Sequence, residues 1–190
     1  SCMWLGSMAL GENMVWVLDE NDTLSYKKVL FTPALRKVVD EAIDNAIDEG
    51  IKTDWKYSNK IAITISKDTF IIEDNGRGIP VRKDDKGEWE CVNAVCKLMT
   101  GSNFSDDDRA TIGMNGVGIK GLNAFSKKFE CVTCDGKGKM KIVCEDNLTK
   151  EKHTELAPTA KTGTKITSSP DFAKFGVKEF STDLINLVKT

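Results

Sequence analysis

The sequence predicts an α+β fold, in which the strands are not separated by regular crossover helices. Two observations support this prediction. The clearest helical pattern, over 31–49, precedes the first strand pair that we identify. Two further helices come next, and the remaining strands follow them. A doubly wound parallel sheet would instead alternate strands and helices along the whole chain. The length of 190 residues suits a single domain over 1–190.

The first helix is amphipathic. Its apolar positions recur at helical spacing: Leu35, Val38, Val39, Ala42, Ile43, Ala46 and Ile47. Pro33 suits its first turn and Gly50 its end. Glu41, Asn45 and Asp48 share the opposite face. The ordinary interpretation is a solvated polar face. The alternative is a carboxylate that polarises a water, one turn from an amide oxygen that binds Mg²⁺.

A hairpin is expected after this helix. Its strands lie at Ile61–Ile65 and Phe70–Glu73, and Ser66–Thr69 forms the turn between them. The strands are short and apolar, and the turn is polar, which is the usual pattern of a hairpin that packs one face on a core. The second strand leads directly into a segment rich in glycine.

That segment reads DNGRGIP, and it begins at Asp74. An Asp/Asn/Gly turn is its simpler interpretation. In the alternative, Asp74 accepts a hydrogen bond from the exocyclic amino group of a base. Gly76 and Gly78 would leave room for a flat ring, and Ile79 and Pro80 would offer it apolar contact.

The second half of the chain reads as helices followed by strands. We expect helices at Cys91–Met99, Val117–Ser126 and Val177–Val188, and strands at Phe129–Cys134, Met140–Cys144 and Thr164–Thr167. The polar stretch 101–115 reads as a solvated loop, and its length also suits a lid that closes over a ligand.

A run of glycines precedes the middle helix, with the sequence GMNGVGIKG from Gly113 to Gly121. Glycines allow the backbone to approach a ligand closely, and the helix that follows points unpaired N–H groups at an anion. Lys120 adds a positive charge directly after the run. Glycine-rich helix entrances are common, so this signal gains meaning only beside the two segments upstream.

Composition excludes several classes of protein. The 27 basic and 29 acidic residues give a net charge of −2, which does not suit a DNA-binding module. No run approaches the ~18 apolar residues of a membrane span, and nothing at the start resembles a secretion signal, so an intracellular protein is expected. Cys131 and Cys134 form the single CxxC, and His153 is the only histidine, so free thiols are expected rather than zinc.

Four motifs in order carry a family resemblance: EAIDN at 41–45, DNGRGIP at 74–80, GMNGVGIK at 113–120, and Gly163-Thr164. Together they resemble the N, G1 and G2 motifs and the GT signature of the GHKL ATPases. The surrounding WLGS, TGSNFSDDD and FSKKFE are similar to eukaryotic and phage type II DNA topoisomerases. The resemblance implies the Bergerat fold, a mixed sheet with helices on one face and the nucleotide between helices and sheet.

The resemblance also implies roles for individual residues. Glu41 would be the general base, Asn45 would bind Mg²⁺, and Asp74 would select adenine through its amino group. Thr164 would support Asp74 through a hydroxyl or a water, and Arg77 would pair with Glu49 at the mouth of the pocket. The remaining expected nucleotide contacts are Asp48, Gly76, Gly78, Ile79, Pro80, Ser102, Asn103, Gly113, Met114, Asn115, Gly116, Val117, Gly118, Ile119 and Lys120.

The implied function is that of the ATPase domain of a type II DNA topoisomerase, with ATP and Mg²⁺ as cofactors. DNA would be bound by other domains of the parent enzyme, and the transducer and DNA-cleavage regions would lie outside this chain. The parent would be a dimer in the cytoplasm, nucleoid or nucleus, whereas the isolated domain is expected to be monomeric. Two alternatives remain at this point: a histidine-kinase-type phosphotransferase and a MutL- or chaperone-like clamp gated by nucleotide.

Overall fold

The structure is a computed structural model, and it describes residues 5–19, 21–97 and 116–190. Its elements in chain order are β1 Gly11–Leu18, β2 Leu24–Phe31, α1 Pro33–Lys52, β3 Ile61–Ile65, β4 Phe70–Asp74, α2 Glu90–Cys96, α3 Gly116–Ala124, β5 Ser126–Cys134, β6 Lys139–Glu145, β7 Lys150–Leu156, β8 Gly163–Pro170, a 3₁₀ turn at Phe172–Phe175, and α4 Thr182–Lys189. This order confirms the predicted α+β class.

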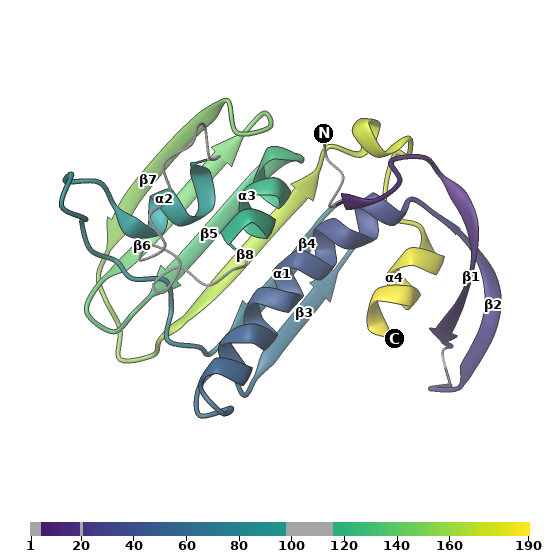
Figure 1. Cartoon of the computed structure of the whole chain (residues 1–190), viewed down its shortest axis with the longest axis horizontal. Coiled ribbons are helices and arrows are strands. Elements are labelled where there is room, and N and C mark those ends of the chain that lie inside the picture. Colours follow the sequence, from purple (N-terminus) through teal and green to yellow (C-terminus); the bar gives the residue numbers. More distant parts are fainter. Residues whose placement is uncertain (1–4, 20, 98–115) are drawn as a thin grey trace.

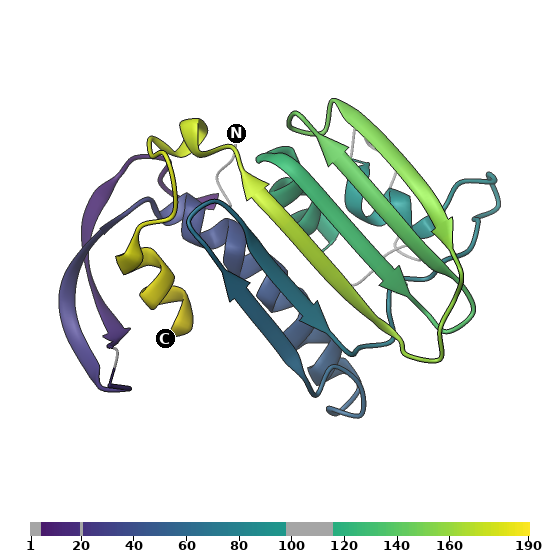
Figure 2. The same ribbon diagram turned by 180° about the vertical axis from the view of Figure 1, so that it is seen from behind.

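A six-stranded sheet forms the centre of the molecule, in the order β3-β4-β8-β5-β6-β7. Helices α1, α2 and α3 cover one face of it, and the opposite face carries no helix among the described residues (Figures 1 and 2). Every described strand pair is antiparallel, so the mixed sheet expected from the resemblance is wrong in this detail. The reason is that β8 enters between β4 and β5 and runs against both.

The core lies between the inner face of the sheet and the three helices. Strand residues alternate, so that Phe129 and Cys131 of β5 point inward while Lys128 and Glu130 point outward. The apolar stripe of α1 is buried at Ala34, Leu35, Val38, Val39, Ala42, Ala46 and Gly50. Each large aliphatic or aromatic side chain buried here contributes roughly 1.5–3 kcal/mol relative to an exposed one.

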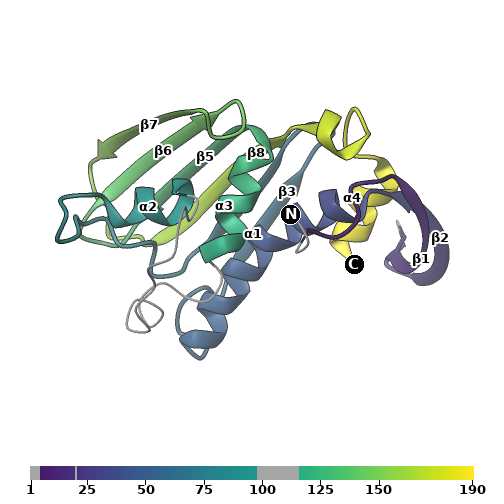
Figure 3. The same ribbon diagram turned by 45° about the horizontal axis from the view of Figure 1, so that its top comes forward.

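A separate two-stranded sheet, β1-β2, curves along the side of the molecule. Helix α4 lies between this ribbon and the N-terminal end of α1 (Figures 1 and 3). We predicted none of β1, β2 and β7. Strand β7 is exposed at every position and pairs only with β6 in the described sheet, so it has no apolar periodicity to detect.

Helix bounds differ from prediction where tertiary contacts intervene. α1 continues past Gly50 to Lys52, and the ring of Trp55 packs against Gly50 where a Cβ would overlap it. α4 begins at Thr182 instead of residue 177, because the side chain of Ser181 caps it by accepting the N–H of Leu184 at 3.1 Å. None of the described helices has the length and apolar character that crossing a bilayer requires.

Candidate functional site

The polar face of α1 meets the first turn of α3. The Glu41 side chain is only 13% exposed. It lies so close to Gly118 that a Cβ at that position would overlap the carboxylate. The absence of a side chain at Gly118 therefore lets α3 approach Glu41. The first N–H groups of a helix lack partners within it. This contact therefore places a carboxylate beside backbone N–H groups that could donate hydrogen bonds to an anion.

Lys37 is a site residue that sequence reasoning missed. Its Nζ lies 2.8 Å from Glu41 Oε1 and 3.4 Å from Asp44 Oδ2. The hydrogen bond to Glu41 is the main reason that the pKa of Lys37 is raised. The spacing of four residues before Glu41 could have revealed this pair, since side chains at i and i+4 meet on a helix surface. Lys37 fixes one oxygen of the Glu41 carboxylate.

Asn45 follows Glu41 by one turn on the same helix. Its Nδ2 donates to the backbone carbonyl of Glu41 at 2.5 Å. This bond fixes the orientation of the amide, and it leaves the Oδ1 atom for a ligand such as a hard cation. Asp48 is half-buried one turn further on. The donor set on this face is therefore made of oxygen atoms, which fits Mg²⁺.

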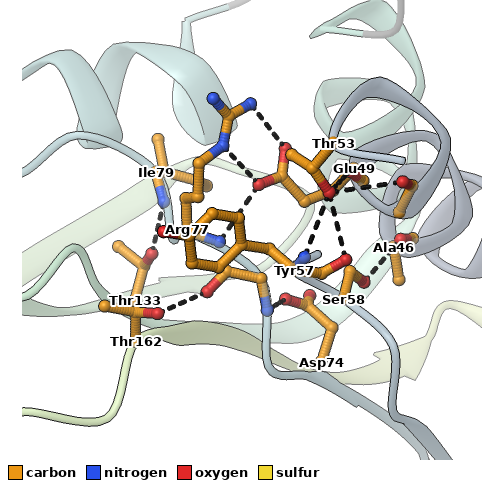
Figure 4. Close-up of polar contacts among 12 residues, drawn as sticks. Ala46, Glu49, Thr53, Tyr57, Ser58, Asp74, Arg77, Ile79, Thr133 and Thr162 are labelled. Atoms are coloured by element: carbon orange, nitrogen blue, oxygen red, sulfur yellow. Dashed lines mark hydrogen bonds and ion pairs between the residues drawn. The ribbon is translucent and has the colours of Figure 1, made fainter. Parts of the chain in front are cut away.

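Asp74 ends β4 and is half-buried. Its Oδ1 accepts the N–H of Gly76 at 2.7 Å (Figure 4). Burial raises the pKa of the Asp74 carboxyl, while the backbone N–H groups of Gly76 and Thr164 oppose that rise. A Cβ at Gly76 would come within 2.7 Å of Asp74 Oδ1 and 2.8 Å of Glu49 Cγ, so a side chain there would have to displace one or both carboxylate side chains.

The glycine-rich segment after β4 is fixed by threonines that we did not predict. Thr162 donates its hydroxyl to the carbonyl of Gly76 at 2.7 Å, and Thr133 accepts the N–H of Ile79 at 2.7 Å (Figure 4). Gly78 has φ +78°, and a Cβ there would overlap the carbonyl of Cys134. Thr133 and Thr162 lie more than 50 residues from this segment in sequence, so no local pattern could identify them.

Thr164 lies beside Asp74 in the sheet. The two residues are register partners in the β4–β8 pair. The Thr164 hydroxyl lies 3.2 Å from the hydroxyl of Thr133, and it is the backbone N–H of Thr164 that acts on the Asp74 carboxylate. The expected support of Asp74 through the Thr164 hydroxyl or a water stays a prediction.

The expected pair of Glu49 and Arg77 is present. Arg77 donates Nε to Glu49 Oε1 at 2.7 Å, Nη2 to Oε2 at 3.1 Å, and its backbone N–H to Oε1 at 3.0 Å (Figure 4). Burial raises the pKa of the Glu49 carboxyl, but these hydrogen bonds outweigh it and hold that pKa below its ordinary value. The pair joins the last turn of α1 to the segment after β4.

The glycine-rich run is described only from Gly116 onward, where α3 begins. The expected contacts Ser102, Asn103, Gly113, Met114 and Asn115 lie outside the described residues. Ile119 is buried in the core at 7% exposure, so its side chain packs and only its backbone remains for a ligand. Lys120 is half-buried, and this burial lowers its pKa. Pro80 is exposed.

The geometry gathers these groups on one side of the molecule. α1 contacts both α3 and β4, so that the Glu41 face and the end of β4 belong to one region (Figure 3). This region combines an ion-paired carboxylate, an oriented amide oxygen, the N-terminus of a helix and a half-buried aspartate. Such a set can activate a water, hold a hard cation, bind an anion and select a base.

Comparison with known proteins agrees with this arrangement. The sequence model of the family described as histidine kinase-, DNA gyrase B- and HSP90-like ATPase matches residues 32–174. The DNA topoisomerase large subunit of Enterobacteria phage T4 is 40% identical over 161 residues, covering 82% of this chain and 31% of the relative. Human DNA topoisomerase 2-alpha is 34% identical over 191 aligned positions, covering 97% of this chain and 12% of the relative. The chain thus spans less than a third of these relatives.

Solved structures give the same result. The ATPase region of Saccharomyces cerevisiae topoisomerase II matches with a TM-score of 0.81 at 29% identity, over 97% of this chain and 51% of that one. The ATPase and transducer domains of Balamuthia mandrillaris topoisomerase II match with a TM-score of 0.81 at 27% identity. The match covers 98% of this chain and 50% of that one. The 43K ATPase domain of Thermus thermophilus gyrase B shares the fold, with a TM-score of 0.65 at 21% identity. That match covers 98% of this chain and 41% of the other. The chain belongs to the histidine kinase-, DNA gyrase B- and HSP90-like ATPase family, and its relatives there include the ATPase regions of type II DNA topoisomerases.

Proposed function

We propose that this chain binds ATP with Mg²⁺ and hydrolyses it, as the ATPase domain of a type II DNA topoisomerase. The observation that carries the proposal is the contact of the Glu41 carboxylate with the first turn of α3 at Gly118. A phosphate chain bound at that helix terminus would lie next to a carboxylate able to accept a proton from water. Family membership and the type II topoisomerase relatives support the same assignment.

The residues divide the chemistry between them. Glu41 accepts the proton of the attacking water, and Lys37 fixes the carboxylate from its other side. Asn45, whose amide is oriented by its bond to the Glu41 carbonyl, would hold Mg²⁺ through Oδ1. When bound, Mg²⁺ neutralises charge on the phosphates. Lys120, directly after the glycine-rich run, adds a second cation on the phosphate side.

Base selection belongs to Asp74. Its carboxylate, when ionised, can only accept a hydrogen bond. Adenine offers an amino group at the matching position, whereas guanine has a carbonyl there and cannot donate. Gly76 and Gly78 keep the neighbouring backbone free of side chains, and Ile79 supplies an apolar contact. The expected result is a preference for ATP over GTP.

The parent protein would couple this hydrolysis to passage of one DNA duplex through another. DNA would be bound by other parts of that protein, which would act as a dimer inside the cell, and this chain alone would be monomeric. The two alternatives from the sequence, a phosphotransferase and a nucleotide-gated clamp, are less favoured because the relatives named above are topoisomerases.

The experiment compares ATP and GTP binding and then follows the γ-phosphate. Calorimetry with Mg²⁺ should show tighter binding of ATP to the 190-residue chain. In single-turnover assays, Glu41→Ala should retain ATP binding but lower phosphate release by about 10²–10⁴-fold. Glu73→Gln, an exposed carboxylate on the outer face of β4, is the matched control and should change neither. Equal affinity for the two nucleotides would contradict the Asp74 role. Label on His153 instead of free phosphate would favour the phosphotransferase.

A further inference from the structure

Two buried thiols outside the nucleotide site lie in contact. Cys96 ends α2 and Cys144 lies in β6. Their Sγ atoms are 3.3 Å apart, and the two residues are 2% and 1% exposed. They are 48 positions apart in sequence, so folding alone brings them together. Both are free thiols.

The surroundings of this pair are polar on one side. Asn123 of α3 is fully buried, and its Nδ2 lies 3.3 Å from Cys144 Sγ and 2.8 Å from the carbonyl of Val95. The same amide thus contacts both the last turn of α2 and the Cys144 sulfur. The amide N–H stabilises negative charge on the Cys144 sulfur.

The pKa values of the two thiols are shifted in opposite directions. A hydrogen bond with Cys96 is the main cause that lowers the pKa of Cys144, and the amide of Asn123 adds to it. The same contact with Cys144, together with burial, raises the pKa of Cys96. Cys144 is thus the thiol that ionises first, and Cys96 is the one that keeps its proton.

We propose that Cys96 and Cys144 form a redox-sensitive dithiol that hydroperoxides convert into an intramolecular disulfide. The Cys144 thiolate attacks one oxygen of the peroxide, forming a sulfenic acid and releasing hydroxide, which takes up a proton to become water. The Cys96 sulfur then attacks the sulfenic sulfur, the S–O bond breaks, and the Cys96 proton leaves with the hydroxyl group as a second water. Two thiols and one hydrogen peroxide therefore give one disulfide and two waters.

The two sulfurs lie close enough to bond after a small approach. A disulfide needs an S–S distance of about 2.05 Å, so the sulfurs must approach by roughly 1.2 Å from their present 3.3 Å. The crosslink would join the end of α2 to the sheet and close a loop over 97–143 that includes all of α3. Because a crosslink restricts the unfolded chain, the oxidised form should unfold at a higher temperature. This inference does not depend on the proposed function.

The test uses the 190-residue chain with Cys2→Ser, which leaves five cysteines. Reduced protein is treated with hydrogen peroxide, the remaining thiols are blocked with an alkylating agent, and the digest is analysed by mass spectrometry. We expect a Cys96–Cys144 crosslinked peptide, loss of two of the five titratable thiols, and a rise in unfolding temperature that dithiothreitol reverses. Peptide mapping of this protein is informative whether or not the further cysteine variants fold.

Matched variants separate this pair from the other thiols. Cys144→Ala and Cys96→Ser should abolish both the crosslinked peptide and the reversible rise in unfolding temperature. Cys91→Ala, which removes another buried thiol, should retain both. A dominant disulfide between other cysteines, five intact thiols after peroxide treatment, or a reversible temperature rise that persists in Cys144→Ala would overturn the proposal.

Discussion

Asp74 and Glu49 both lie against Gly76, yet their environments act on the two carboxyl groups in opposite directions. Burial dominates at Asp74 and raises its pKa, because the two opposing N–H groups do not compensate for lost hydration. At Glu49 burial is outweighed by the hydrogen bonds from the guanidinium and backbone of Arg77, which together lower the pKa. The Asp74 carboxylate has therefore lost hydration that a hydrogen bond from a ligand could replace. The Glu49 carboxylate already has its hydrogen-bond partner in Arg77.

Replacing Asp74 should weaken nucleotide binding specifically. We expect Asp74→Ala to cost roughly 1.5–3 kcal/mol of ATP affinity, the usual value for a hydrogen bond to a charged group. The acceptor must be ionised, so ATP affinity should fall as the pH drops through the Asp74 pKa, which is raised above 3.8. Calorimetry over a pH series measures this, with Glu155→Ala on the exposed strand β7 as control. A pH profile that is the same in wild type and Asp74→Ala would refute it.

The Glu49–Arg77 pair should stabilise the fold in a pH-dependent way. The folded-state pKa of Glu49 is lowered, so its contribution is present above the unfolded value of 4.5 and is lost as the pH falls through the folded-state pKa. Arg77 is 56% exposed, so solvent screening limits the effect of Arg77→Ala to about 0.5–1 kcal/mol at neutral pH. Urea unfolding at about pH 7 and about pH 3, on either side of the ordinary glutamate range, checks this. A penalty that is equal at both pH values would exclude the ion pair as its source.

At the scale of elements, the approach of α3 to α1 depends on a glycine. The first turn of α3 rests against the Glu41 side chain at Gly118, with no space for a Cβ. A bulkier residue would have to displace the carboxylate or the whole helix. Because Lys37 already holds that carboxylate, displacement would also disturb an ion pair. The contact therefore couples the position of α3 to the orientation of the proposed base.

Gly118→Ala should separate these two helices. We expect a loss of stability of about 1–3 kcal/mol, as for other overpacked positions. A loss of ATP affinity should accompany it, since the α3 terminus that would bind the phosphates is displaced. Gly11→Ala on β1, where a Cβ would meet nothing within 4 Å, is the control. Thermal unfolding and calorimetry measure both effects, and wild-type stability in the Gly118→Ala variant would show that the helices are free to adjust.

The helices and strands that the sequence predicted well are those whose apolar residues recur at a regular spacing. α1, the β3–β4 hairpin and the β5–β6 pair were found because their buried positions recur at helical or alternating spacing. β7 was missed because every one of its residues is exposed, and β6 is its only strand partner among the described residues. The antiparallel sheet could not be foreseen because nothing local in β8 indicates which strands it joins.

The site shows the same limit. Motifs predicted Glu41, Asn45, Asp74 and the glycines as site residues because these lie in compact sequence segments whose roles the resemblance implies. Thr133 and Thr162, which hold the segment after β4, come from distant parts of the chain and have no distinctive local pattern. The spacing of Lys37 to Glu41 could be read from the sequence, but many surface lysines share that spacing.

For the molecule as a whole, nucleotide should stabilise the fold by mass action. ATP at about 100 times its dissociation constant adds roughly 2.7 kcal/mol if it binds only the folded chain. For a domain of this size each kcal/mol raises the unfolding temperature by roughly 2–4 °C, so a rise of about 5–10 °C is expected. Thermal unfolding with and without Mg-ATP measures it. Asp74→Ala should show a smaller rise at the same concentration, and equal rises would contradict the assigned base contact.

The position of β8 also has a consequence for how the molecule folds. β8 is among the last strands to be synthesised, yet it lies between β4 and β5, and its partner positions Asp74 and Thr164 are 164 − 74 = 90 residues apart. Without β8 the sheet would divide into two pieces, β3–β4 and β5–β6–β7, each with an open edge. Closing so long a loop makes this pairing a slow step, during which β4 and β5 are exposed to association with other chains. The nucleotide site, which draws on both pieces, cannot form before that step.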